Sequence, residues 1–83
     1  MSVSFRTKRN HYDLGPTLHF MRFVSEVASI GGYPHLERML DMNEDATNSK
    51  NRGFLVSEAR AILVEGKLTE HSTWVAQQIA EFK

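Results

Sequence analysis

The chain has 83 residues, ten of them basic and ten acidic, and it contains no cysteine. A single domain of this size buries only about 60 to 65% of the surface that its unfolded chain exposes, so we expect low stability. Balanced charge argues against the broad one-sign field that holds nucleic acid or an anionic membrane. Without cysteine there are no disulfides, and the apolar runs are too short to span a bilayer, so we expect a soluble cytoplasmic protein with no membrane partner.

Residues 1–15 are predicted to form an extended basic arm followed by a turn. Val3 and Phe5 alternate with polar residues, which is typical of a short strand or of an arm that lies on the body of the domain. The following residues, up to Gly15, are of types that favour turns.

Residues 16–83 are predicted to form one small helical domain. Pro16 suits the first position of a helix, and Gly31 and Gly32 provide a left-handed stop. Between them the apolar residues recur at helical spacing and cover about half of the circumference; they are Phe20, Met21, Phe23, Val24, Val27, Ala28 and Ile30. Such a wide apolar arc requires several neighbouring helices or a second copy of the chain, so a homodimer is an open alternative.

A second, shorter helix is expected to open at Pro34 and to fade near Asn43. Residues 43–53 have one apolar residue, Ala46, and burial cannot hold such a segment down. We therefore predict a mobile loop over residues 43–53.

Two further helices are expected in the last third of the chain. Ser57 is a candidate cap of the third helix, with Glu58 at its positive end and Gly66 just after its last turn. Thr69 or Ser72 is expected to cap the fourth helix. The apolar stripe of that helix consists of Leu68, Val75, Ile79 and Phe82.

Together these elements predict an all-α fold, a compact bundle of about four short helices with an extended N-terminal arm. The alternative is an α+β fold with a short two-stranded sheet, in which residues 3–7 pair with a strand around residues 54–56.

The sequence has no catalytic constellation, phosphate loop or cysteine nucleophile, so we predict a protein that is not an enzyme and has no cofactor. A further alternative, a small hydrolase or transferase, would need titratable groups that converge in a pocket. The four histidines lie in separate segments without the short spacings of metal ligands, so no metal is expected; they are His11, His19, His35 and His71.

Trp74 is expected to project from a polar helix face, together with Gln77, Gln78 and Glu81 and away from the apolar stripe. A large aromatic side chain on a polar face is typical of a contact residue, so these four residues form our first candidate partner-binding face. The alternative is that the first helix or the N-terminal arm covers Trp74.

A second candidate partner-binding face is the basic cluster of Arg6, Lys8 and Arg9, which lies close to Tyr12 in sequence. Basic side chains beside an aromatic ring can grip phosphates or an acidic protein surface. The alternative is a solvated terminus that keeps the protein soluble.

The function predicted from these features is a non-enzymatic interaction module that binds a larger protein and modulates it, as inhibitors or adaptors of phage and mobile-element type do. The alternative is a small nucleic-acid-binding regulator, because the helix pair expected in residues 54–83 resembles a helix-turn-helix and the basic arm can contact phosphates. That pair carries four acidic and three basic residues, and its connection is longer than the tight turn of the motif.

Overall fold

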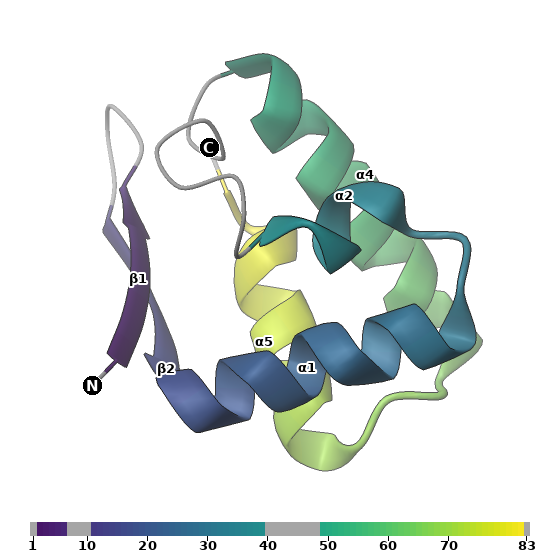
Figure 1. Cartoon of the computed structure of the whole chain (residues 1–83). Coiled ribbons are helices and arrows are strands. Elements are labelled where there is room, and N and C mark those ends of the chain that lie inside the picture. The colour runs from purple at the N-terminus through teal and green to yellow at the C-terminus, as the bar shows by residue number, and fades with distance from the viewer. Residues whose placement is uncertain (1, 7–10, 40–48, 83) are drawn as a thin grey trace.

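The structure is a computed structural model of the chain, and it describes residues 2–6, 11–39 and 49–82. Within these residues the elements follow one another as β1 (Ser2–Arg6), β2 (His11–Pro16), α1 (Thr17–Ile30), α2 (Pro34–Glu37), α4 (Ser49–Glu65) and α5 (Glu70–Ala80). The helices pack against one another as a small bundle (Figure 1). The prediction of a compact all-α bundle is therefore confirmed.

The first helix follows its predicted pattern closely. Phe20, Phe23 and Val27 are buried on one face of α1, and the amide of Gly31, at a φ of 77°, donates to the carbonyl of Val27 where the helix ends. Only glycine enters this left-handed region at low cost. Met21, which the sequence pattern assigned to the apolar arc, is half exposed, so the buried arc is narrower than predicted.

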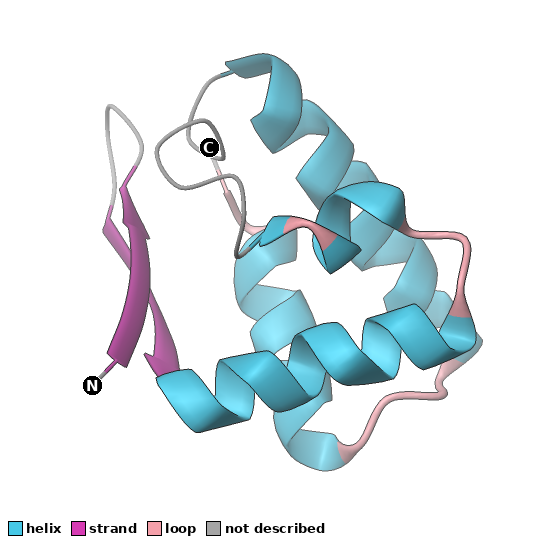
Figure 2. Ribbon diagram, in the orientation of Figure 1, coloured by secondary structure: helices cyan, strands magenta, loops and turns pink. Residues whose placement is uncertain are grey.

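The N-terminal residues form a β-hairpin at one side of the helices (Figure 2). The strands β1 and β2 are antiparallel, and Phe5 lies opposite Tyr12 in their register. Leu14 is completely buried and anchors β2 in the core, while the Tyr12 hydroxyl donates to the carbonyl oxygen of Glu81 at 2.9 Å. The alternative sheet with residues 54–56 is wrong, because those residues are helical in α4.

Helix α4 begins at Ser49, which is eight residues before the predicted cap at Ser57. The predicted loop is therefore wrong for residues 49–53, while residues 43–48 lie outside the described residues. A helix nucleated by a buried stripe gains one backbone hydrogen bond for each residue it adds, so it can extend into a polar segment. Helix α2 ends at Glu37, and its predicted continuation beyond Met39 also lies outside the described residues.

A single hydrophobic core joins β2 to all four described helices and to the residues that follow α2 and α5. Its buried members are Leu14, Phe20, Phe23, Val27, Leu36, Met39, Leu55, Ala59, Ile62, Val75, Ala76, Ile79 and Phe82. None of the helices in the described part of the chain combines the length and the apolar composition that crossing a bilayer requires.

Candidate functional site

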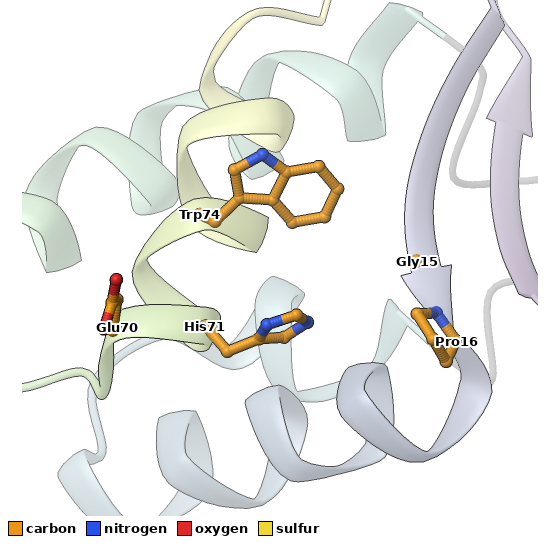
Figure 3. Close-up of a pocket in the computed structure, with 5 residues that line it drawn as sticks. All are labelled: Gly15, Pro16, Glu70, His71 and Trp74. Carbon is orange, nitrogen blue, oxygen red and sulfur yellow. The ribbon is translucent and has the colours of Figure 1, made fainter.

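An open depression of about 530 Å³ lies between α5 and the junction of β2 with α1. Its lining residues are Gly15, Pro16, Glu70, His71 and Trp74. Figure 3 shows the rings of His71 and Trp74 projecting from α5 toward Gly15 and Pro16, with Glu70 on the other side of the helix start. Two segments that are far apart in the sequence therefore build this surface.

The wall opposite Trp74 is shaped by a turn at the end of β2. Gly15 has a φ of 86°, and its amide donates to a carboxylate oxygen of Asp13 at 2.9 Å, which is the bond of an Asx turn. A Cβ atom added at Gly15 would lie 3.6 Å from Cζ3 of Trp74, an ordinary contact distance. The backbone conformation, and not a lack of space, is what requires glycine here.

Two of the four histidines meet at this site. The ring centroids of His19 on α1 and His71 on α5 are 4.1 Å apart in an edge-to-face arrangement, and the ring of Trp74 lies 6.0 Å beyond His71. Sequence spacing could not reveal this pair, because it depends on how α1 and α5 cross. Within the described residues, no group of three or more histidine, aspartate or glutamate side chains is placed to hold a metal ion.

The start of α5 is capped by a carboxylate from α1. Thr69 occupies the N-cap position, as predicted, but its side chain caps no backbone amide of α5, and its hydroxyl lies 3.3 Å from the hydroxyl of Ser72. Instead, the amide and the hydroxyl of Thr69 each donate to Glu26 at 2.9 Å, and the hydroxyl of Ser72 donates at 2.5 Å. A carboxylate is favourable at this end of a helix, where free amides and the helix dipole place partial positive charge.

These contacts shift the ionisation of Glu26. Burial by itself would raise the pKa of the carboxyl, but the hydrogen bonds from Ser72 and Thr69, together with the charge of Arg22, outweigh burial and lower the pKa below 4.5. Glu26 therefore keeps its negative charge at the start of α5.

The start of α2 is capped in the same way by Glu58. One carboxylate oxygen of Glu58 accepts the amides of His35 and Leu36, and the other contacts the imidazole of His35. The sequence placed Glu58 at the positive end of its own helix, and this assignment is wrong because α4 begins well before it. The ring of Phe54 stacks on His35 at 4.4 Å, so this second cluster is held by both charge and packing.

The four residues of the first candidate face project from one side of α5. Trp74 is 39% exposed, Gln77 and Glu81 are exposed, and Gln78 is half-buried. Gly15 at the end of β2 lies beside the indole, and part of the Trp74 surface stays exposed. We call these four residues the Trp74 face.

Most of the second candidate face lies outside the described residues. Arg6 is the last residue of β1, where its backbone pairs with His11, while Lys8 and Arg9 lie outside the described residues. Of the residues that line the depression, the sequence pattern indicated only Trp74. Gly15, Pro16, Glu70 and His71, and the neighbouring His19, carry no local signal of proximity to Trp74.

Comparison of the chain with protein-family models, with curated proteins and with solved structures finds no match.

Proposed function

We propose that this protein is a non-enzymatic module that binds a larger protein and modulates it, as an inhibitor or an adaptor, through the Trp74 face. The observation that carries the proposal is the exposure of Trp74, the single tryptophan of the chain, beside an open depression. Trp74 is not a member of the buried hydrophobic core.

The energetics support a contact role. With 39% of its surface exposed, Trp74 has on the order of 100 Å² left to bury, which is worth about 2 kcal/mol against a partner. The neighbouring Gln77 and Glu81 are exposed on the same helix side and provide the polar rim that surrounds such anchors.

The nucleic-acid alternative receives less support from the geometry. A recognition helix reads bases with the residues near its N-terminus. At that end of α5 lie the carboxylates of Glu26 and Glu70, and the helix has no lysine or arginine. Binding to duplex or single-stranded nucleic acid that weakens steeply as the salt concentration rises would support this alternative.

The size and chemistry of the chain support the proposed class of protein and the proposed location. A short chain that blocks or bridges a surface needs no catalytic group, and inhibitors or adaptors encoded by phages and other mobile elements are of this type. The absence of cysteine supports placement in the cytoplasm.

The test is site-specific photo-crosslinking in the cells that produce the protein. A photoreactive amino acid at Gln77 should capture one partner, and the purified partner should bind the Trp74→Ala variant at least about fivefold more weakly than the unaltered protein. Val64→Ala is the matched control, because Val64 is also exposed but lies on α4. Equal affinities for Trp74→Ala and Val64→Ala would refute the role of the Trp74 face.

A further inference from the structure

The charge along α5 is of one sign. Between Glu70 and Ala80 the helix has no lysine or arginine. Glu70 lies four residues before Trp74 and lines the same depression, and Glu81 lies seven residues after Trp74. Among the described residues, neither carboxylate takes part in an ion pair. Two carboxylates without an ion-pair partner in the described part of the chain therefore lie before and after Trp74 along the helix.

The depression offers apolar surface next to these charges. Gly15 and Pro16 form one wall and the rings of His71 and Trp74 form the other (Figure 3). Long basic side chains bury their methylene groups along such surfaces while the charged head contacts water or a carboxylate. An aromatic ring face also attracts a cation, and this attraction is strongest for tryptophan.

The start of α5 is not open to an anion. The amide and the hydroxyl of Thr69 and the hydroxyl of Ser72 already donate to Glu26. An incoming phosphate or carboxylate would meet the charges of Glu26 and Glu70 without finding those donors free. The chemistry of this surface therefore favours a cationic ligand.

We propose that the Trp74 face recognises a basic segment of its partner protein, with the guanidinium group of an arginine stacked on the indole of Trp74 and paired with Glu70 or Glu81. The walls formed by Gly15 and Pro16 receive the methylene stem of that arginine. This inference rests on the proposed protein-binding function and specifies the chemistry of the partner.

The single tryptophan makes the test direct, because all indole fluorescence of the protein comes from Trp74. The probe is an acetylated glycine–serine peptide that carries spaced arginines. Matched peptides replace each arginine with citrulline, which has nearly the same shape without the charge, or with glutamate. The arginine peptide should shift the emission of Trp74 saturably, and the citrulline peptide should bind at least about fivefold more weakly.

Charge variants locate the binding site. Glu70→Gln and Glu81→Gln should each weaken binding of the arginine peptide by about two- to fivefold. The control Glu37→Gln removes the same charge from α2 and should leave binding unchanged. Trp74→Phe, followed by calorimetry, tests stacking with a variant that keeps a ring, and circular dichroism verifies that each variant is folded.

The proposal is overturned if the citrulline or glutamate peptide binds as well as the arginine peptide, or if Glu37→Gln weakens binding as much as Glu70→Gln. It is also overturned if the arginine peptide leaves Trp74 emission unchanged. The cellular crosslink separates this inference from the proposed function. A crosslinked partner whose binding depends on Trp74 but that lacks a basic segment would contradict only this inference. Binding of the arginine peptide without any such partner would contradict only the proposed function.

Discussion

The hydroxyl of Ser72 donates a hydrogen bond of 2.5 Å to the carboxylate of Glu26, and this bond ties the first turn of α5 to the middle of α1. The same carboxylate holds the amide and the hydroxyl of Thr69. The helix that presents Trp74 is thus fixed at its start by a residue from another helix.

Replacing Glu26 with glutamine should lower the free energy of unfolding by about 1 to 2 kcal/mol, because the amide group loses the charge and one of its acceptor atoms. Urea denaturation followed by circular dichroism measures the change. Glu37→Gln serves as the control and should change stability by less than about 0.5 kcal/mol. Similar losses in both variants would contradict the capping role of Glu26.

The lowered pKa of Glu26 predicts a specific dependence of stability on pH. The ordinary pKa of the carboxyl is 4.5, and the folded value lies below it, so the contribution is fully present above pH 4.5 and is lost as pH falls through the folded value. Unaltered protein should therefore lose more stability between pH 6 and pH 3 than Glu26→Gln does. Urea denaturation of both proteins at several pH values in this range measures their free energies of unfolding. Equal dependence of the two free energies on pH would contradict the prediction.

Tyr33 provides a spectroscopic test of the packing between α2 and α4. Its hydroxyl donates to Glu65, and this bond, together with burial and the charges of Glu65 and Glu58, raises the pKa of Tyr33 to about 12. Ultraviolet titration of tyrosinate should therefore include a step near pH 12 from Tyr33. Glu65→Gln should move that step toward 10, the ordinary value, and an unmoved step would show that the bond is absent in solution.

Gly15 should be intolerant of a side chain because of its backbone and not because of crowding. Gly15→Ala is expected to lower stability by about 1 kcal/mol or more, since φ is positive there. Emission from Trp74 should stay close to that of the unaltered protein, because the added Cβ would make only an ordinary contact. Thermal denaturation and fluorescence measure the two effects.

Gly53 is the matched control for Gly15. It is exposed within α4, with open space where a Cβ would lie, so Gly53→Ala should raise stability by up to about 1 kcal/mol. Equal effects of the two alanine substitutions would show that the turn at Gly15 is not as described.

The sequence predicted those features that depend on nearby residues. Gly31 and Gly66 end helices as expected, Thr69 stands at the start of α5, and Trp74 lies outside the apolar stripe. These features follow from backbone conformation and helical periodicity, which act over a few residues.

Most of the missed features depend on contacts between different elements. The start of α4 at Ser49 extends beyond the buried stripe, and a solvated helical turn has no apolar signature. The pairing of β1 with β2, the meeting of His19 with His71 and the capping of α5 by Glu26 each join residues from different elements. Only the packed fold brings them together, so single-sequence patterns are silent about them.

The carboxylate caps have a practical consequence for anyone seeking a minimal binding fragment. Glu26 and Glu58 supply from α1 and α4 the anchors that the starts of α5 and α2 do not supply for themselves. A synthetic peptide with the sequence of α5 would lose this anchor and the wall at Gly15, and it would be too short to stay helical in water. The surface around Trp74 cannot be excised, because it exists only while the whole chain is folded.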